Sequence, residues 1–474
     1  MLFKYFYDTA LAHASYMVGC QRTGEAIIID AGRNIEQYLD AAKKEGMKII
    51  GVADTHIHAD YVSGAREMAD RIGAKLHVSD EGPAEWKYEY AKEYDHQLLK
   101  DGDTFSAGNV QFQVLHTPGH TPESISFLLT DFGGGADRPM GIFTGDFVFV
   151  GSIGRPDLLE EAAGIMGTAE PGARDLFKSI EKFNALPDHL QVWPAHGAGS
   201  ACGKGLGSIP SSTVGYEKLF NPALQYKDEQ AFVNYILAEQ PEAPKYFALM
   251  KHVNRVGPEI LGEPKLPAKI NTDKLGNIIA TEMVVDTAVA KKFAAAHVED
   301  TINIQPKYVA MWGGSLLDYD KPVYLISSVK DLSEVVRILH KIGMDNIGGY
   351  FDADEVAEAG LNTESILQVS PEELAKKVSL GEVELIDIRG INERNKMAPA
   401  ESKYSFLGLM FQNTEQFKAN KAYAFCCRTG GRSVIAASIA QKFGAKNAMN
   451  MDGGLVAWEL ARLPLAAKAT PSAG

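Results

Sequence analysis

The first half of the chain alternates short apolar runs with polar and amphipathic segments. Runs of the kind typical of β-strands lie at 26–30, 48–53, 110–115 and 141–144. From residue 216 to about 261 the pattern becomes that of helices. The segment 262–269 then places two prolines among small and charged residues, as a linker does. We therefore predict an α/β domain over residues 1–262.

Two later segments of about 100 residues each share one pattern, an α/β unit repeated along the chain. Each begins with a short apolar strand that ends in Asp and continues with a second strand and a helical run that ends in Gly. The strands are expected at 283–286 and 323–326, and again at 384–387 and 423–426. This repeat predicts two further domains, at 271–362 and 363–465. The tail after Pro464, rich in small residues, is expected to be frayed.

Composition agrees with a multidomain α/β protein and narrows its partners. The 474 residues are enough for about three domains, and 45% of them are apolar. The net charge of -14 repels phosphate backbones and anionic lipid, so neither nucleic acid nor a membrane is expected as a partner. No leader or long apolar segment is apparent, which predicts a cytoplasmic protein. Four cysteines are too few for a disulfide framework.

Histidine and aspartate side chains gather in four short loops of the first domain, and each loop follows a predicted strand. Such loops often carry function. Two imidazoles and a carboxylate on one face, with open positions, suit non-haem Fe(II), and the same set suits zinc. The loops are Thr55-His56-Ile-His58-Ala-Asp60-Tyr61, Leu115-His116-Thr-Pro-Gly-His120-Thr121, Phe143-Thr-Gly-Asp146 and Trp193-Pro-Ala-His196-Gly197.

Together these loops resemble those of the metallo-β-lactamase superfamily over about residues 1–260. The resemblance implies an αββα sandwich with metal-binding loops at one edge. Within the superfamily the chain is most similar to persulfide dioxygenases, because Gly154-Arg155-Pro-Asp157 follows Asp146 at the spacing found in that branch. The resemblance implies that His56, His120 and Asp146 hold a mononuclear iron. It also implies that Arg155 binds the carboxylate or phosphate end of the substrate.

Tyr61 separates two kinds of metal centre. Binuclear hydrolases of the superfamily have a histidine at this place as a ligand of the second metal, and a neutral tyrosine does not easily replace it. One metal ion is therefore expected. His58, Asp60 and His196 are then expected to orient the ligands or to hold water around the metal. His116 is expected to be structural.

The loop after His196 bears on the thiol carrier of the substrate. Glutathione-using members continue with Asp-Tyr at this point, whereas this chain continues with residues 197–207, which contain five glycines and a lysine. Such a loop can bring backbone N–H groups close to an anion, which leaves coenzyme A persulfide open beside glutathione persulfide. A flexible surface loop is the alternative. Cys202 lies in this loop, close enough to His196 in the sequence to contact the substrate or take part in sulfur relay, and its role is left open.

A second reactive centre is predicted near the C-terminus. The strand at 423–426 leads into Cys427-Arg428-Thr-Gly-Gly-Arg432-Ser433, and a helical run follows. Amide groups at a helix start and two arginines lower the pKa of a thiol and stabilise a thiolate, which is the environment of a nucleophile. The alternatives are an inert buried thiol and a phosphatase loop that runs from Cys426 to Arg432. Phe425 stands where a phosphatase would have a histidine.

With the motifs around Asp387 and Gly454, the cysteine loop resembles a rhodanese sulfurtransferase domain over residues 363–465. The resemblance implies that Cys427 carries a persulfide within a catalytic loop that also contains Arg428 and Arg432. The segment 271–362 resembles the same fold. Its corresponding loop, 326–333, has no cysteine, so we expect a rhodanese-like domain without activity.

The resemblances imply that a low-molecular-weight persulfide is oxidised by O2 to sulfite at the iron. Sulfur transfer through Cys427 would then give thiosulfate, or run in reverse. The expected partners are glutathione or coenzyme A persulfide, O2, sulfite and thiosulfate, and a homo-oligomer is left open. Two alternatives stay open: a zinc-dependent glyoxalase II-type thioester hydrolase with an independent rhodanese, and a non-enzymatic persulfide sensor or sulfur carrier.

Overall fold

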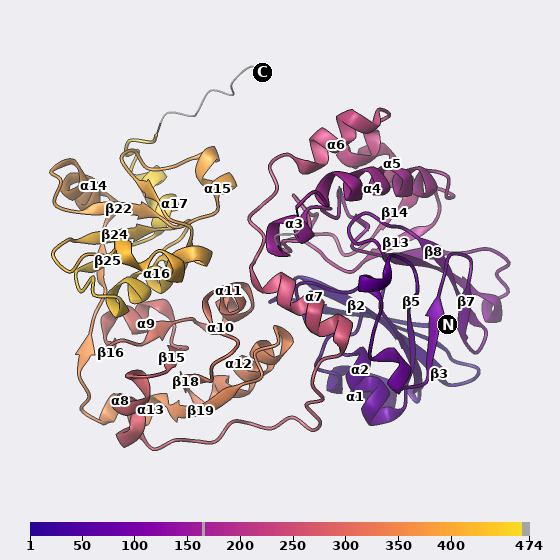
Figure 1. The fold of residues 1–474 in the computed structure, drawn as a ribbon, viewed down its shortest axis with the longest axis horizontal. Coiled ribbons are helices and arrows are strands. Elements are labelled where there is room, and N and C mark those ends of the chain that lie inside the picture. The colour runs from indigo at the N-terminus through magenta and orange to yellow at the C-terminus, as the bar shows by residue number, and fades with distance from the viewer. Residues whose placement is uncertain (164–165, 467–474) are drawn as a thin grey trace. The chain divides into compact units, whose positions relative to one another are not determined.

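The structure is a computed structural model that describes residues 1–163 and 166–466. The chain divides into two compact units. One contains Met1–Pro264 and the short segment His340–Gly343, and the other contains Lys265–Leu339 and the chain from Met344 onward. Figure 1 shows the course of the chain through each unit. Most of the tail that the sequence predicts to be frayed, residues 467–474, lies outside the described residues.

The described part of the first unit contains two six-stranded sheets and a small two-stranded ribbon. In one sheet, antiparallel pairing from β1 to β3 gives way to parallel pairing from β3 to β6. In the other, only β10 and β13 pair in parallel. The first sheet has β1 (Leu2–Asp8), β2 (His13–Cys20), β3 (Glu25–Ile29), β4 (Lys48–Ala53), β5 (Lys75–Ser79) and β6 (His96–Leu99). The second has β14 (Ser212–Thr213), β13 (Gln191–Pro194), β10 (Gly141–Gly145), β9 (Ile125–Asp131), β8 (Val110–His116) and β7 (Thr104–Ala107), and the ribbon has β11 (Val148–Phe149) and β12 (Ser152–Ile153).

The helices α1 (Glu36–Glu45) and α2 (Ala65–Ile72) pack on the outer face of the first sheet, and α4 (Ala169–Asn184), α5 (Val214–Phe220) and α6 (Glu229–Leu237) pack on the outer face of the second. Two further helices, α3 (Leu158–Ala163) and α7 (Tyr246–Val256), contact each other. Short 3-10 turns lie at Ala84–Trp86, Ala91–Glu93, Phe132–Gly134 and Pro222–Gln225. Helix α1 ends at Gly46, whose φ of 65° allows the left-handed cap that closes the helix.

Alternation along the strands explains why the sheets form a sandwich. In β3, Ile27 and Ile29 face the other sheet and join the core between them, whereas Ile28 faces outward and packs with α1 and α2. A third cluster packs α4 to α6 on the outer face of the second sheet through residues such as Leu176 and Phe232. The predicted αββα metallo-β-lactamase sandwich is confirmed, and three layers of apolar contact hold it together.

The second unit begins with a four-stranded parallel sheet of order β17-β15-β18-β19. A small antiparallel pair joins β16 to β20, so the pairing of this part extends to Glu364, two residues beyond the predicted boundary. The strands are β15 (Met283–Asp286), β16 (His297–Val298), β17 (Ile302–Asn303), β18 (Val323–Ser327), β19 (Ile347–Asp352) and β20 (Thr363–Glu364). The helical segments are η5 (Thr272–Lys274), α8 (Leu275–Ile279), α9 (Ala290–Ala295), α10 (Pro306–Tyr308), the π-helix η6 (Val309–Gly313), α11 (Gly314–Leu316), α12 (Val329–Lys341) and α13 (Ala353–Glu358).

The C-terminal part has a five-stranded parallel sheet of order β21-β25-β24-β22-β23. Its strands are β21 (Leu367–Val369), β22 (Glu384–Asp387), β23 (Lys403–Tyr404), β24 (Tyr423–Cys426) and β25 (Ala448–Met451). Its helical segments are α14 (Pro371–Ser379), α15 (Ile391–Lys396), η7 (Leu407–Gln412), η8 (Thr414–Gln416), α16 (Gly431–Lys442) and α17 (Gly454–Leu460). The strands predicted for both repeats are therefore confirmed as β15, β18, β22 and β24.

The two parts of the second unit contact each other along α16. The Asn303 amide donates to Ser438 Oγ at 3.1 Å, and Lys442 Nζ donates to the Asp300 carbonyl at 2.9 Å. Among the described residues, none of the helices combines the length and the apolar character that a membrane-spanning helix needs.

Candidate functional site

The predicted metal-binding loops meet at one edge of the sandwich, because each follows the end of a strand. The strands β4, β8, β10 and β13 lead respectively into the loops that carry His56, His120, Asp146 and His196. Within the described ranges, His56, His120 and Asp146 form a group whose ligand atoms all lie within 4.8 Å of one another. The structure thus brings together the three residues that the resemblance implies as ligands.

The geometry of this group fits a metal ion. Asp146 Oδ2 lies 3.8 Å from His56 Nε2 and 3.6 Å from His120 Nε2. All three atoms are buried, and none has a hydrogen-bond partner in the part of the chain that the structure describes. Burying unpaired polar atoms is costly, and a cation bound between them would offset that cost. Two imidazoles and one carboxylate suit non-haem iron and also zinc.

Hydrogen bonds on the far side of each imidazole direct the Nε2 lone pairs toward Asp146. His120 Nδ1 donates to the Arg155 carbonyl at 2.9 Å, which leaves Nε2 unprotonated in the neutral ring. His56 Nδ1 lies 3.0 Å from Thr55 Oγ1, whose hydroxyl donates to Asp30. Burial lowers the pKa of His120 to about 4 and holds the pKa of His56 well below its usual range. Both rings are therefore neutral at pH 7, as metal binding requires.

His196 joins the three-residue group to a second one. Its Nδ1 lies 2.6 Å from Asp146 Oδ1 and its Nε2 lies 2.7 Å from Asp60 Oδ2. Burial opposes a charge on this ring, but the two carboxylates outweigh it and raise the pKa of His196 well above its usual value. Asp60, His196 and Cys202 form a further group of close ligand atoms. These three predicted residues therefore lie around the candidate metal site.

His58 belongs to a different network. It groups with Asp30 and Asp54, and its Nε2 lies 3.1 Å from Asp30 Oδ1. Asp54 accepts from the Ser63 hydroxyl at 2.8 Å. Burial opposes protonation of the His58 ring, but the hydrogen bond to Asp30 raises its pKa overall. His58 therefore bonds to Asp30 through Nε2, while its Nδ1 is buried without a hydrogen-bond partner among the described residues.

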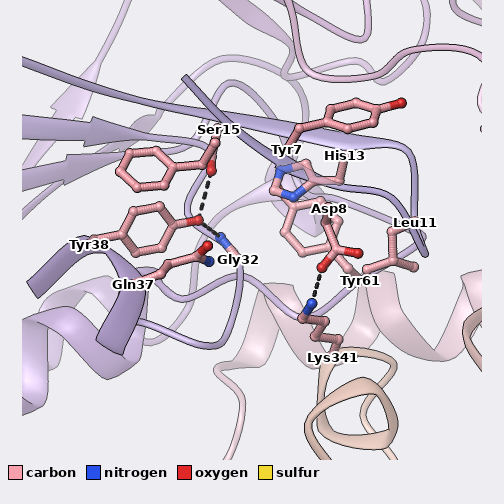
Figure 2. Close-up of a pocket in the computed structure, with 11 residues that line it drawn as sticks. Tyr7, Asp8, Leu11, His13, Ser15, Gly32, Gln37, Tyr38, Tyr61 and Lys341 are labelled. Atoms are coloured by element: carbon pink, nitrogen blue, oxygen red, sulfur yellow. Dashed lines mark hydrogen bonds and ion pairs between the residues drawn. The ribbon is translucent and has the colours of Figure 1, made fainter. Parts of the chain in front are cut away.

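Tyr61 packs among aromatic rings. Its ring centroid lies 4.0 Å from that of His13 and 4.5 Å from that of His58, and its hydroxyl donates to the Asp30 carbonyl at 3.4 Å. Figure 2 shows His13 and Tyr61 lining a small pocket, which the Tyr38 side chain also lines. Tyr61 thus lines this pocket and packs against His58, a placement that the sequence did not reveal.

Arg155 lies in the interior of the first unit. Its guanidinium donates twice to Asp157, at 2.7 and 2.6 Å, and once to the Pro241 carbonyl at 2.6 Å. Its carbonyl holds His120, and an added Cβ at the preceding Gly154 would overlap the Asp146 carbonyl oxygen. The structure therefore shows Arg155 as a residue that positions His120. Its predicted contact with the substrate stays a prediction, and the donors named here are directed at protein acceptors.

Lys204, the cation of the glycine-containing loop, is also tied to the protein. Its Nζ donates to the carbonyls of Tyr235 and Ala238 at 2.7 and 2.9 Å. The described structure therefore directs this ammonium toward the end of α6. The predicted use of the loop as an anion site stays a prediction.

Sequence reasoning missed two buried charged residues beside the candidate metal site, Lys251 on α7 and Glu123 after His120. Both are buried, and the charge of Lys251 interacts with Glu123, Cys202 and His120. The sequence of α7 contained a signal that could have revealed Lys251. Lys251 shares a face with Phe247 and Asn254 that is otherwise buried in the structure, and a lysine on such a face needs an explanation.

The predicted cysteine loop curls around its sulfur. Cys427 Sγ accepts from the Gly430 amide at 3.2 Å and lies 3.4 Å from Ser433 Oγ, where α16 begins. An added Cβ at Gly454 would lie 2.5 Å from the Cys427 carbonyl oxygen, so only glycine allows α17 to approach this closely. Burial raises the pKa of the neighbouring Cys426 thiol well above its usual value, which favours Cys427 as the nucleophile.

The arginines of this loop differ in their surroundings. Arg428 is exposed, whereas Arg432 forms a two-pronged ion pair with Glu393 at 2.7 and 2.9 Å. Tyr308, from the part of the second unit without cysteine, reaches the start of α16, and its hydroxyl would lie 2.7 Å from a Cβ added at Gly431. The loop is therefore bordered by a residue from outside the C-terminal part.

Comparison with known proteins agrees with this geometry. Residues 8–196 match the model of the metallo-beta-lactamase superfamily, and residues 370–461 match that of the rhodanese-like domain. A crystal structure of a metallo-beta-lactamase from Staphylococcus aureus subsp. aureus COL is 42% identical, with a TM-score of 0.67. The match covers 74% of this chain and 98% of the staphylococcal one.

Two curated relatives match a shorter region. The mitochondrial persulfide dioxygenase of Bos taurus is 25% identical over 48% of this chain and 78% of its own length. A beta-lactamase hydrolase-like protein of Xylella fastidiosa is 30% identical over 48% of this chain and 53% of its own length, so the match spans about half of that relative. The sandwich, the grouped histidines and these matches together show that the chain belongs to the metallo-β-lactamase superfamily and carries a rhodanese-like domain toward its C-terminus.

Proposed function

We propose that the first unit is a persulfide dioxygenase with a single non-haem iron, and that the rhodanese-like domain transfers sulfur through Cys427. The observation that carries the proposal is the group of buried, unpaired atoms of His56, His120 and Asp146 in a chain that also holds the Cys427 loop. Similarity to the persulfide dioxygenase of Bos taurus supports this assignment.

His56, His120 and Asp146 would hold the iron. When bound, Fe(II) supplies the redox chemistry that the reaction of O2 with sulfur needs. Around it, His196 holds a proton between Asp146 and Asp60, and the burial of all three side chains keeps bulk water away from the reacting sulfur. The carbonyl of Arg155 keeps His120 oriented throughout.

The proposed oxidation balances as persulfide plus O2 plus water giving thiol, sulfite and two protons. The outer sulfur of the persulfide is oxidised, its bond to the inner sulfur breaks, and O2 accepts four electrons. The thiol carrier is released in its reduced form. Glutathione and coenzyme A are the proposed carriers, with O2, sulfite and thiosulfate as the other small-molecule partners.

The proposed sulfur transfer runs through Cys427. Its thiolate attacks the outer sulfur of a second persulfide, the carrier thiol leaves, and a persulfide forms on the cysteine. Sulfite then attacks the outer sulfur, which gives thiosulfate and returns the thiolate. The Gly430 amide stabilises the negative sulfur in both steps. The same steps in reverse would form persulfide from thiosulfate.

The proposed organisation places the dioxygenase at 1–262, a rhodanese-like domain without cysteine at 271–362 and the active rhodanese at 363–465. Tyr308 gives the middle domain a role, because it borders the loop in which Cys427 lies. That domain would line part of the path along which sulfite or persulfide reaches Cys427.

O2 uptake by protein loaded anaerobically with Fe(II) tests both activities, with glutathione persulfide and coenzyme A persulfide as substrates. We expect uptake in the wild type and its loss in His120→Ala. The Cys427→Ser variant should keep uptake and release sulfite in place of thiosulfate.

Two outcomes would contradict the proposal. Tightly held zinc with thioester cleavage and no O2 uptake would establish the glyoxalase II-type hydrolase. Inactivity of the iron-loaded protein with both persulfides, together with persulfide formation on Cys427, would leave a sulfur carrier or sensor.

A further inference from the structure

Helix α7 is fastened to the loop that carries His56. Asn254 Nδ2 donates to the carbonyls of His58 and Tyr61 at 2.8 and 2.7 Å, and the Tyr246 hydroxyl donates to the Asp60 carbonyl at 3.1 Å. These bonds hold one face of α7 against the candidate metal centre. Any side chain on that face between Tyr246 and Asn254 is therefore directed into the interior of the first unit.

Lys251 is such a side chain. Only 9% of it is exposed, and its Nζ is buried without a hydrogen-bond partner among residues 1–163 and 166–466. The ammonium lies 4.8 Å from the ring centroid of Trp86. A cation–π contact is worth a few kcal/mol at most, which is less than the cost of burying an ammonium without an acceptor. Among the described protein groups, Lys251 therefore has no hydrogen-bond acceptor that would offset the cost of burying its ammonium.

Two further buried polar atoms, one on Glu123 and one on Tyr88, lack a hydrogen-bond partner in the described structure. Glu123 Oε1 accepts from the Ile57 amide at 2.8 Å, but Oε2 has no hydrogen-bond partner within the described ranges, and the same holds for the Tyr88 hydroxyl. The charge of Glu123 interacts with both Lys251 and Tyr88. No ion pair joins Lys251 to Glu123 in the described structure, so the two charges are near each other without direct contact.

The three groups can all act as donors at neutral pH. Burial lowers the pKa of Lys251 only to about 8, so the ammonium stays mainly protonated. Burial also raises the pKa of Glu123 to about 7 and that of Tyr88 well above 10. An ammonium, a phenol and a partly protonated carboxyl together suit an oxygen anion.

We propose that Lys251, Tyr88 and Glu123 form a subsite for a small oxyanion beside the candidate metal centre. Glu123 lies three residues after His120 and accepts from the amide of Ile57, the residue that follows His56, which places the subsite beside the candidate metal centre. The identity of the anion rests on the proposed function, under which it is either the sulfite product or a carboxylate of the thiol carrier. Lys251 is then a residue that selects anionic substrates or retains sulfite for transfer.

Binding of sulfite and of S-methylglutathione to the full chain tests the subsite, with no persulfide or O2 needed. Trp86 supplies a local signal, because the ammonium lies over its indole and an anion on Lys251 will change its fluorescence. We expect at least one ligand to change the fluorescence of the wild type and Trp86→Phe to abolish that change. Lys251→Met should weaken binding at least about tenfold, in line with loss of a charge-assisted contact.

Lys245→Met is the matched control, because Lys245 is exposed just before α7 begins. It should bind as the wild type does, and Lys251→Arg should retain more affinity than Lys251→Met. Sulfite binding alone identifies the product as the anion, and S-methylglutathione binding alone identifies the carrier carboxylate. Equal affinity of Lys251→Met and wild type, or no binding of either ligand by the wild type, overturns the subsite. Neither result depends on whether the protein consumes O2.

Discussion

His196 Nδ1 lies 2.6 Å from Asp146 Oδ1, while the other oxygen of the same carboxylate faces His56 and His120. Asp146 therefore pairs with His196 through Oδ1 and faces His56 and His120 through Oδ2. The ion pair fixes the rotation of the Asp146 carboxylate, so Oδ2 is aimed at the candidate metal site before any ion binds. This orientation lowers the entropy cost of assembling the site.

Replacement of His120 should weaken metal binding at the candidate site. The Nε2 atom of His120 is one of the three buried ligand atoms of this group that have no hydrogen-bond partner within the described ranges, so His120→Ala should lower metal affinity at least about tenfold. His116→Ala is the control, because His116 lies on the same loop and its ring contacts the Pro122 carbonyl at 2.9 Å, away from the group. Metal content after dialysis against a weak chelator measures both. Equal metal content in the two variants would remove His120 from the ligand set.

Thr55 should affect metal affinity without being a ligand of the metal. Its hydroxyl connects His56 Nδ1 to Asp30, so Thr55→Val should lower metal affinity roughly 10- to 100-fold while the chain stays folded. Thr117→Val is a matched change, since Thr117 is also buried but bonds to Ser126. Competition with a metal-sensitive dye reports the affinity. The prediction fails if the two variants bind metal equally well.

Thiosulfate should place one sulfur atom on Cys427 and none on Cys426. The Gly430 amide faces Cys427 Sγ, whereas burial raises the pKa of Cys426 and keeps it a thiol. Intact-mass measurement should show a gain of one sulfur atom in the wild type and in Cys426→Ser, and no gain in Cys427→Ser. A gain that survives Cys427→Ser and disappears in Cys426→Ser would reverse the assignment.

Tyr308 and Gly431 should be energetically coupled. A methyl group at Gly431 would lie 2.7 Å from the Tyr308 hydroxyl, so Gly431→Ala forces Tyr308 to move. We expect Gly431→Ala to destabilise the wild type more than it destabilises Tyr308→Ala, with a coupling free energy of about 1 kcal/mol. Urea unfolding of the four proteins in this cycle measures the coupling. Additive effects would show that Tyr308 does not border the cysteine loop in solution.

The stability contribution of Lys251 should depend on pH. Burial lowers its pKa from 10.5 to about 8, so below pH 8 the ammonium is charged in the folded and unfolded chain alike and its burial is fully penalised. Lys251→Met should therefore be more stable than the wild type at pH 7, by on the order of 3 kcal/mol. Between pH 8 and 10.5 the unfolded chain binds more protons, so the wild type gains stability and the difference shrinks.

Urea unfolding at pH 7, 8.5 and 10, in buffers free of sulfur oxyanions, measures this difference. Lys245→Met, at an exposed position, should show no such trend. A difference between Lys251→Met and wild type that stays constant over this range would mean that Lys251 is solvated in the folded protein.

Much of the fold was predictable because its determinants are local. Strand β3 alternates residues between two cores, and the repeated strand-ending aspartates Asp286 and Asp387 marked equivalent places in the two later sheets. The boundary at residue 363 was less predictable. Strand β20 pairs with β16, 65 to 67 residues earlier, and such pairing depends on how the chain returns in space.

The candidate site also has features that the sequence predicted and features that only the tertiary structure revealed. Residue types and spacing indicated His56, His120, Asp146 and the Cys427 loop, because chemistry restricts which side chains can bind a metal or act as a nucleophile. The direction of His58 toward Asp30, the burial of the Arg155 guanidinium against Asp157, and the approach of Lys251 required the tertiary structure. His58 finds its partner 28 residues earlier in the chain, and the Arg155 guanidinium, besides its neighbour Asp157, donates to the Pro241 carbonyl from a distant segment.

The amino-acid sequence by itself thus determined the kinds of groups available and the strand ends at which they stand, since both follow from composition and local periodicity. Only the tertiary structure decided which atom of each group is left without a partner. That outcome depends on hydrogen bonds between loops that meet at one edge of the sandwich, and on α7 packing against them, neither of which local sequence encodes.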